Sequence, residues 1–237
     1  MAAKRLSGWV RETKQDDVHQ LFGYHGWVVP EYKIVCTTVP KVACTTVKVV
    51  LHHLAGRGVP NPPARVHDQD NDLLLGQFDV AEIVEMLSSP DWTRFCFVRN
   101  PYHRLFSAYK SKIGQTWDDQ YAWLCDAIRE RFDYPEQGGK RVGMVTFADF
   151  VHYLVSCGAR IRYDLDPTAI FDGHYNAQTR ILRTDVISYD FVGRFENLAE
   201  DLRSVLTRVG VSEETMALGE EVRNQTRQVP LPSAYSR

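Results

Sequence analysis

The chain has 237 residues, and its 28 Lys and Arg nearly balance its 30 Asp and Glu, which gives a formal net charge of −2. This balance excludes a strongly basic nucleic-acid binder, whose affinity would rest on neutralising phosphates. With 44% hydrophobic and 24% charged residues, the composition is that of a folded protein and excludes disordered, collagen-like and coiled-coil chains. Any capacity to bind phosphate must therefore be local.

The sequence lacks the signals of a membrane or secreted protein. No stretch approaches the roughly 18 consecutive apolar residues of a spanning helix, and the N-terminal apolar residues give way to a polar run at residues 11–17. The cysteines form no Cys-x-x-Cys pair, so we expect reduced packing thiols and no metal. They are Cys36, Cys44, Cys96, Cys125 and Cys157. We therefore expect a soluble cytoplasmic protein.

The first predicted unit is a strand followed by a loop and a helix. Residues 1–30 are a polar and aromatic lead-in. Residues 33–37 form a β-branched run that is typical of a buried strand. The apolar residues over 45–54 have helical spacing, and Gly56 is placed to end that helix. Prolines then predict a loop over residues 57–72.

A second unit of the same kind follows. Residues 73–87 carry the apolar residues of a packed helix, and residues 94–98 form a second strand. That strand leads into Asn100, which suits a helix N-cap, and Pro101, which suits the first helical position. The predicted helix then packs apolar residues as far as Ile113.

The remaining chain is predicted to contain two helices, a loop, a third strand and a last helix. In chain order these cover residues 121–132, 146–155, 158–172, 189–195 and 198–209. Asn197 and Glu200 form a plausible capping pair at the start of the last helix. Three strand–helix units favour an α/β fold with a central parallel sheet flanked by helices.

The loop between the first strand and its helix is a candidate phosphate site. A loop that leaves a strand and enters a helix turns several backbone N–H groups toward one point. This loop adds small side chains, hydroxyls and positive charge, at Ala43, Cys44, Thr45, Thr46, Lys41 and Lys48. The glycine-rich ATP-binding form is not present, so a surface turn remains an alternative reading of this loop alone.

The turn after the second strand is further evidence for a phosphate-binding site. Arg99 stands at the carboxyl end of that strand, where open α/β sheets bind ligands. Arg104 and Ser107 follow on the next helix. The alternative is a structural arginine that caps its own turn. Two anion sites at adjacent strand ends would suit a ligand with two phosphate groups.

Three blocks of the sequence resemble sulfotransferases that use 3′-phosphoadenosine 5′-phosphosulfate (PAPS). Residues 40–46 (PKVACTT) resemble the loop for the 5′-phosphosulfate. Residues 97–109 (FVRNPYHRLFSAY) resemble the 3′-phosphate motif, and residues 191–198 (FVGRFENL) a third block. Order and spacing resemble most the Golgi-type carbohydrate sulfotransferases that act on chondroitin, dermatan and heparan. Their membrane anchor and lumenal disulfides have no counterpart here, so we expect a soluble, bacterial-type member.

The resemblance implies a P-loop-like, three-layer sulfotransferase fold and a role for individual residues. We expect one domain over residues 1–237, with a PAPS-binding core at 33–209 and a closing segment at 210–237. The 3′-phosphate would be held by Arg99 and Ser107. Lys41 would also stabilise the leaving oxygen during in-line transfer without a metal. The 5′-phosphosulfate would be wrapped by Lys41, Val42, Ala43, Cys44, Thr45 and Thr46.

Two histidines are candidates for the base that accepts the proton of the acceptor hydroxyl. His67 lies between the two PAPS blocks, where related carbohydrate sulfotransferases carry a histidine base. A solvated loop histidine is its alternative reading. His174 lies in a passage that resembles a later family block, although Tyr175 and Ala177 replace the expected Trp and Pro. We treat His174 as a substrate-binding candidate and as the rival base.

The resemblance implies a hydroxyl acceptor on a sugar or glycolipid, with PAP as the product and no nucleic-acid partner. A homodimer is one possible assembly. Two other functions stay open: a P-loop kinase, which the first loop alone would permit, and a non-catalytic nucleotide-binding module. The kinase would need the glycine-rich loop that this sequence lacks.

Overall fold

In this computed structural model, the backbone forms two compact units, and each is described by itself. The first comprises residues 1–99 and 176–227, and the second comprises residues 100–175 and 228–237. The described residues are 25–58, 60, 63–67, 72–114, 119–158, 172–213 and 216. Most of the predicted lead-in, of the loop over 158–172 and of the closing segment therefore lies outside them. The expected single domain stays a prediction.

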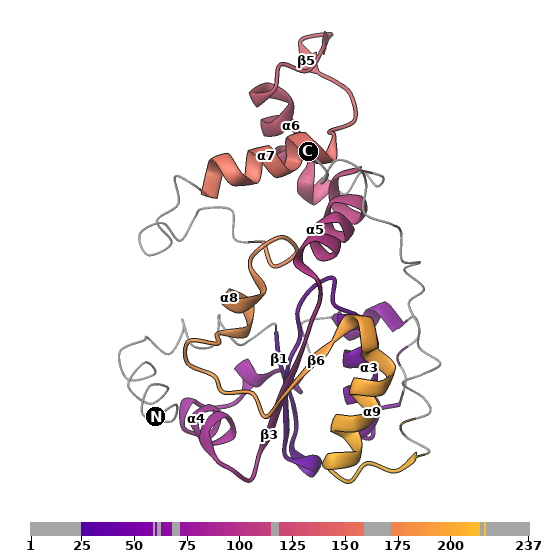
Figure 1. The fold of residues 1–237 in the computed structure, drawn as a ribbon, viewed down its shortest axis with the longest axis vertical. Helices are drawn as coiled ribbons and strands as arrows, with labels where there is room; N and C mark the ends of the chain where they lie inside the picture. The colour runs from indigo at the N-terminus through magenta and orange to yellow at the C-terminus, as the bar shows by residue number, and fades with distance from the viewer. Residues whose placement is uncertain are drawn as a thin grey trace. The chain divides into compact units, whose positions relative to one another are not determined.

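The first unit is built on a four-stranded sheet in the order β1-β2-β3-β6 (Figure 1). The pairs β2–β3 and β3–β6 are parallel, as the sequence predicts, and β1 adds an antiparallel strand at the edge. The strands are β1 Gly26–Val29, β2 Ile34–Thr37, β3 Thr93–Val98 and β6 Phe191–Arg194. The α/β fold with a parallel core is confirmed.

Strand β1 lies in the segment that the sequence assigned to the lead-in, and that part of the assignment is wrong. All four of its residues are buried, because the two faces of the strand pack into different apolar clusters. Trp27 and Val29 belong to the larger cluster, and Val28 belongs to the cluster on the opposite face of the sheet. A run of four residues that is buried on both faces has no alternation. The polar sequence around it therefore concealed it.

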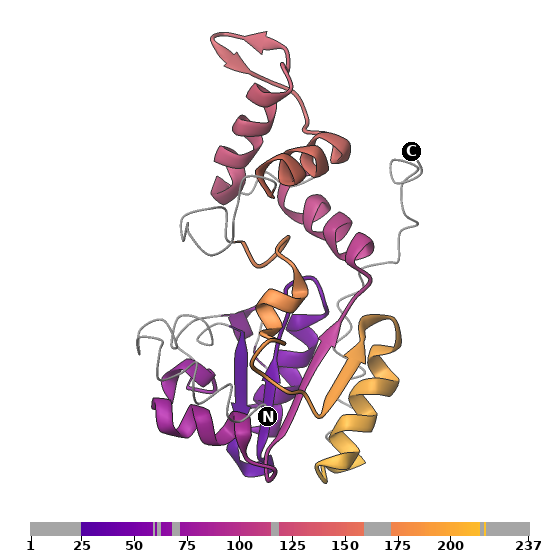
Figure 2. The same ribbon diagram turned by 60° about the vertical axis from the view of Figure 1, so that its left-hand side comes forward.

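Helices cover both faces of the sheet (Figure 2). On one face α3 and α9 pack with the larger apolar cluster, through residues such as Val50 and Val205. On the other face α4 packs Ile83 and Met86 against Val28 and Val35 of the sheet. The helices are α3 Cys44–Leu54, α4 Val80–Ser88 and α9 Leu198–Arg208. Shorter turns are η1 Pro30–Tyr32, η2 Pro63–His67, η3 Leu75–Gln77, α8 Gln178–Leu182 and η6 Phe195–Asn197.

One helix start and one predicted helix cap differ from the structure. Helix α4 begins at Val80 and not near residue 73, because Asp79 and Glu82 form a capping box. The Asp79 carboxylate accepts from the Glu82 amide at 2.8 Å, and the Glu82 carboxylate accepts from the Asp79 amide at 3.0 Å. At α9 the predicted capping pair is wrong, since Asn197 makes no side-chain cap.

The second unit is helical and has an aromatic core. Rings of Phe106, Tyr109, Phe147 and Phe150 pack at centroid distances of 5.1 to 6.2 Å. As predicted, Asn100 caps its first helix by accepting from the amides of the second and third helical residues. Its elements are α5 Pro101–Tyr109, η4 Lys110–Gly114, η5 Asp119–Tyr121, α6 Ala122–Arg131, β4 Glu136–Gln137, β5 Lys140–Arg141 and α7 Phe147–Gly158.

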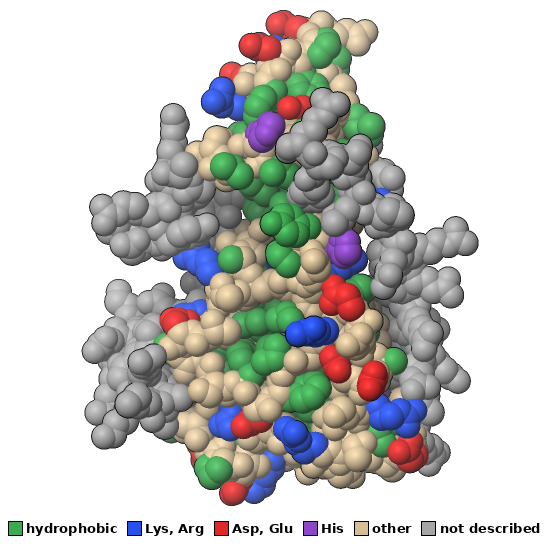
Figure 3. Space-filling model, in the orientation of Figure 1, with side chains coloured by type: hydrophobic (Ala, Val, Ile, Leu, Met, Phe, Trp, Pro, Cys, Tyr) green, Lys and Arg blue, Asp and Glu red, His purple; other side chains and the backbone are tan. Residues whose placement is uncertain are grey.

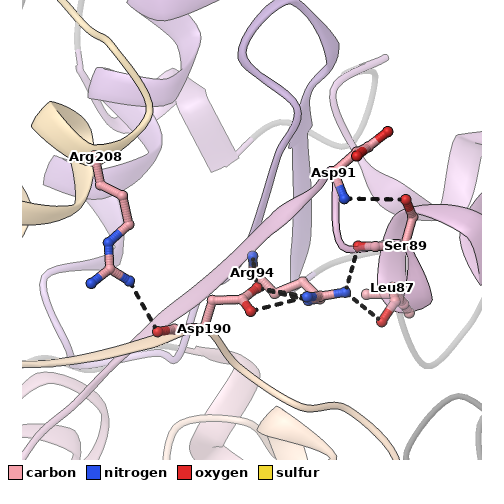
Figure 4. A network of polar contacts seen from close by, with 6 residues as sticks. All are labelled: Leu87, Ser89, Asp91, Arg94, Asp190 and Arg208. Carbon is pink, nitrogen blue, oxygen red and sulfur yellow. Dashed lines mark hydrogen bonds and ion pairs between the residues drawn. The ribbon is translucent and has the colours of Figure 1, made fainter.

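A buried arginine fastens the sheet to the end of α4 (Figure 4). The Arg94 Nε and Nη2 atoms donate to the Asp190 carboxylate at 2.9 and 3.0 Å. Its Nη1 atom donates to the carbonyls of Leu87 and Ser89, at the carboxyl end of α4. This buried charge is paired and hydrogen-bonded, as a charge removed from water must be. The contact fixes the start of β6 beside β3.

Gly193 of β6 lies so close to Phe97 of β3 that no larger residue fits. A Cβ atom at this position would meet the Phe97 Cε1 and Cδ1 atoms at 2.3 and 2.6 Å, and Phe97 is buried. We expect Gly193→Ala to lower the free energy of unfolding by about 1–3 kcal/mol through overpacking. Val192→Ala, at an exposed neighbour on the same strand, should change it by about 0.5 kcal/mol or less. Urea unfolding compares the two, and equal values would contradict this account.

The distribution of surface charges agrees with the nearly balanced numbers of basic and acidic residues. Basic and acidic side chains are interspersed over the sheet-bearing unit on the face that Figure 3 shows. The five cysteines are free thiols, and burial raises the pKa of Cys96 to about 12. Across the described ranges, the helices are all too short or too polar to cross a bilayer.

Candidate active site

The carboxyl ends of three parallel strands lie at one edge of the first unit's sheet. Thr37 at the end of β2 pairs with Cys96 of β3, and Val98 at the end of β3 pairs with Arg194 of β6. This edge therefore brings together the loop before α3, Arg99 and the turn before α9. This edge is where α/β sheets bind ligands.

The loop between β2 and α3 has a strained backbone. Lys41 and Ala43 have φ angles of 68° and 50°, in the left-handed region that glycine favours. Such residues persist where the surrounding structure holds them, and they gather at binding sites. Val42, between them, is held in the core at 1% exposure. We call residues 38–43 with the first turn of α3 the phosphate loop.

The start of α3 has the polarity that an anion requires. Its N-cap residue, Ala43, has no side chain that can cap the helix. The first N–H groups of an α-helix have no acceptor within the helix, and they carry the positive end of its dipole. Cys44 and Thr45 are half-buried there, whereas Thr46 is buried. The predicted residues of this loop are thus assembled at one helix N-terminus.

Arg99 joins the phosphate loop to the turn before α9. Its Nη1 atom donates to the Lys41 carbonyl at 3.0 Å, and its guanidinium lies 4.0 Å from the centroid of the Phe195 ring. Its backbone is held on both sides by Gln178, whose amide accepts from Arg99 N at 2.9 Å and donates to Arg99 O at 2.8 Å. The side chain is therefore fixed at the strand edge.

A donor atom of the Arg99 side chain is buried. Its Nε atom makes no hydrogen bond within the described part of the chain. Burial lowers the pKa of Arg99, and the charge of Glu196 offsets this in part. A buried cationic donor without a partner is costly unless something accepts from it. An anionic ligand fits this position.

His67 lies against α3 and contacts two residues of that helix. Its Nε2 atom is 2.9 Å from Thr45 Oγ1, and its Nδ1 atom is 3.3 Å from Lys48 Nζ. Lys48, expected to add charge to the loop, is 2% exposed and lies 5.2 Å from the ring centroid of Trp27. Burial lowers the pKa of Lys48 to about 8.

His174 forms a hydrogen-bonded cluster within the second unit. Its Nδ1 atom is 2.7 Å from Asp172 Oδ1, and Tyr121 donates its hydroxyl to the other carboxylate oxygen of Asp172. The His174 amide also donates to this carboxylate, at 2.7 Å. Burial raises the pKa of Asp172, but these hydrogen bonds outweigh it and leave the pKa at about 2. Asp172 is therefore an ionised partner for the imidazole.

Two predicted residues on α5 have different surroundings. Ser107 is half-buried. Arg104, expected beside it as an anion ligand, is 4% exposed and donates to the Gly173 carbonyl. Its guanidinium supports the segment that carries Asp172 and His174.

Sequence reasoning missed three residues that contact the predicted ones or their neighbours: Gln178 and Phe195 contact Arg99, and Tyr121 contacts Asp172. Gln178 and Phe195 lie in segments that resemble sulfotransferase blocks, but nothing in the neighbouring sequence indicates that they contact Arg99. Tyr121 gave no signal at all, because Asp172 is 51 residues away along the chain. Within the described ranges, no group of three or more His, Cys, Asp or Glu side chains is arranged to hold a metal ion.

Comparison with known proteins supports the resemblance of the three blocks. Carbohydrate sulfotransferase 11 of Rattus norvegicus is 32% identical over 196 residues, which cover 79% of this chain and 53% of that protein. Carbohydrate sulfotransferase 14 of Danio rerio is 33% identical over 189 residues, which cover 78% and 48%. Carbohydrate sulfotransferase 12 of Xenopus laevis is 28% identical over 228 residues, which cover 85% and 52%. The chain thus spans about half the length of these curated relatives.

No solved structure gives a significant match. The sequence model described as the Sulfotransferase family matches residues 24–230, which include the phosphate loop, Arg99, and the turn before α9. The chain belongs to the sulfotransferase family.

Proposed function

We propose that the chain transfers a sulfuryl group from PAPS to a hydroxyl of a carbohydrate or glycolipid. The observation that carries this proposal is the position of Arg99, which connects the phosphate loop to the turn before α9. It also has one buried donor that makes no hydrogen bond to the residues that the structure describes. The names of the relatives, which are carbohydrate sulfotransferases, support a sugar acceptor.

The residues at the strand edge fit a nucleotide with two anionic ends. The N-terminus of α3, where Ala43 provides no side-chain cap, suits the 5′-phosphosulfate. The buried Nε of Arg99, to which no described residue is an acceptor, suits the 3′-phosphate. The resemblance assigns Ser107 to the same 3′-phosphate. PAPS supplies the activated sulfuryl group when bound. The groups that would wrap its 5′ end are Lys41, Val42, Ala43, Cys44, Thr45 and Thr46.

Lys41 is the proposed stabiliser of the leaving oxygen. Its strained backbone is fixed by the Arg99 contact to its carbonyl, and its side chain is half-exposed. A fixed cation acts most strongly where negative charge grows during the reaction, because no reorganisation is needed at that moment. The positive end of α3 acts in the same direction.

The proton acceptor has two candidates, and their contacts favour His174. The Asp172 carboxylate holds Nδ1–H of His174, which leaves Nε2 as the accepting nitrogen, as in other Asp–His pairs. Both ring nitrogens of His67, by contrast, contact α3. The assignment of His67 as general base stays a prediction, and so does that of His174.

A titration with nucleotides tests the donor class. We expect the chain to bind PAP with micromolar affinity, without need for Mg²⁺, and in preference to ATP. Arg99→Ala should weaken PAP binding by about tenfold to a hundredfold, since a charge-assisted hydrogen bond contributes about 1.5–3 kcal/mol. Isothermal titration calorimetry measures both.

The matched control is Arg183→Ala, because Arg183 pairs with Asp185 at the surface and should leave PAP binding unchanged. A preference for ATP with Mg²⁺ would support a kinase instead. PAP binding without sulfation, in a mass-spectrometric panel of sugars and glycolipids, would support the non-catalytic module.

A further inference from the structure

Three side chains from the start of α3 and from η2 form a hydrogen-bonded row. Thr45 and Lys48 are three residues apart on α3, so both face the same neighbour. That neighbour is His67 of η2, which places Nε2 2.9 Å from Thr45 Oγ1 and Nδ1 3.3 Å from Lys48 Nζ. Both ring nitrogens are thus occupied by α3.

The chemistry of Lys48 sets the direction of each hydrogen bond in this row. An ammonium group can only donate, so Nδ1 of His67 must accept. A neutral imidazole whose Nδ1 accepts carries its proton on Nε2. That proton donates to Thr45 Oγ1. Although burial lowers the pKa of Lys48, its value of about 8 keeps the ammonium form dominant at pH 7.

The hydroxyl of Thr45 still has its own proton to donate. Its oxygen accepts from His67, so its O–H points away from the ring. Thr45 is the second residue of α3, within the first turn, where the helix N–H groups also point. A hydroxyl donor in this turn can add to the N–H groups that favour an anion at this end of the helix.

We propose that His67 is a positioning residue, which together with Lys48 turns the Thr45 hydroxyl toward the 5′-phosphate of the bound nucleotide. This inference rests on the proposed function, because it assumes a nucleotide at the phosphate loop. It gives His67 a role other than that of general base. A base needs an accepting nitrogen, whereas in this row Nε2 already carries the proton.

The two roles of His67 predict opposite results in nucleotide binding. Loss of a base slows transfer and leaves PAP affinity intact. Loss of the positioning residue frees the Thr45 hydroxyl and weakens PAP binding. We expect His67→Ala and Thr45→Val each to weaken PAP binding about threefold to tenfold, as for one hydrogen bond. The double variant should bind no more weakly than Thr45→Val, because both changes remove the same contact.

Calorimetric titration with PAP measures these effects, and each variant is first shown to be folded by urea unfolding. His52→Ala is the matched control, since His52 lies on α3 but contacts the Gly58 carbonyl. The amide of His67→Gln can still donate to Thr45 but cannot act as a base. This variant should restore most of the PAP affinity and most of the transfer rate. An affinity of His67→Ala within twofold of the wild type would overturn the inference.

The tautomer of His67 gives a second test that needs no functional assay. In ¹⁵N-histidine-labelled protein at pH 7, the His67 signal, assigned by its loss in His67→Gln, should show a proton on Nε2 and none on Nδ1. A proton on Nδ1 would overturn the inference even if the wild type binds PAP. Failure of the wild type to bind PAP, with the Nε2 tautomer present, would instead count against the proposed function.

Discussion

Lys41→Ala should lower kcat for sulfuryl transfer by about a hundredfold to a thousandfold, the usual effect of removing one fixed group that stabilises developing charge. The affinity for PAP should fall much less, because the loop backbone and Arg99 remain. Alanine is the suitable replacement, since it carries the same left-handed backbone cost as lysine at a φ of 68°. Lys41→Gly would also relieve the backbone strain of the loop, so its effect on kcat would combine two changes.

Lys33→Ala provides the control for the Lys41 variant. Lys33 also has a positive φ, of 49°, but its side chain is exposed and lies 3.6 Å from Asp91 at the surface. Its loss should leave kcat unchanged. Single-turnover measurements with PAPS separate transfer from release of the product. If Lys41→Ala lowered PAP affinity and kcat in equal measure, or neither of them, the assigned role would be wrong.

His174→Ala should lower kcat by about a hundredfold to ten-thousandfold if His174 is the general base. Asp172→Asn should come close to this loss, because an amide can donate to Nδ1 and so favour the tautomer that carries its proton on Nε2. PAP affinity should be unchanged in both variants. The measurement is kcat for a sugar acceptor, together with calorimetric PAP affinity.

His152→Ala is the control in the same unit, because His152 is exposed on α7. It should have normal kcat. Normal turnover by His174→Ala would return the base assignment to His67, and His67→Gln would then be inactive. The two histidines are thus distinguished by four variants and two readouts.

The local sequence determined most of the fold. Hydrophobic periodicity, together with capping and helix-breaking residues, correctly predicted strands β2, β3 and β6 and helices α3, α5 and α9. Each of these elements has its pattern within a short stretch of sequence. The errors arose where local patterns compete. At residues 73–87 the apolar spacing allowed an early helix, but the Asp79 capping box fixed the start at Val80. Strand β1 was not predicted, because its burial on both faces depends on the two layers of helices that pack against the sheet.

For the candidate site, the sequence by itself predicted a ligand with two anionic groups and candidate residues for it at two strand ends. The phosphate loop and Arg99 follow their strands directly, so short-range order was enough to find them. Only the tertiary structure decided what these residues contact. It buried Lys48, gave His67 two partners on α3, and placed His174 in contact with Asp172 and Tyr121. The role of a histidine depends on what each ring nitrogen contacts, and most of these contacts join residues far apart in the chain.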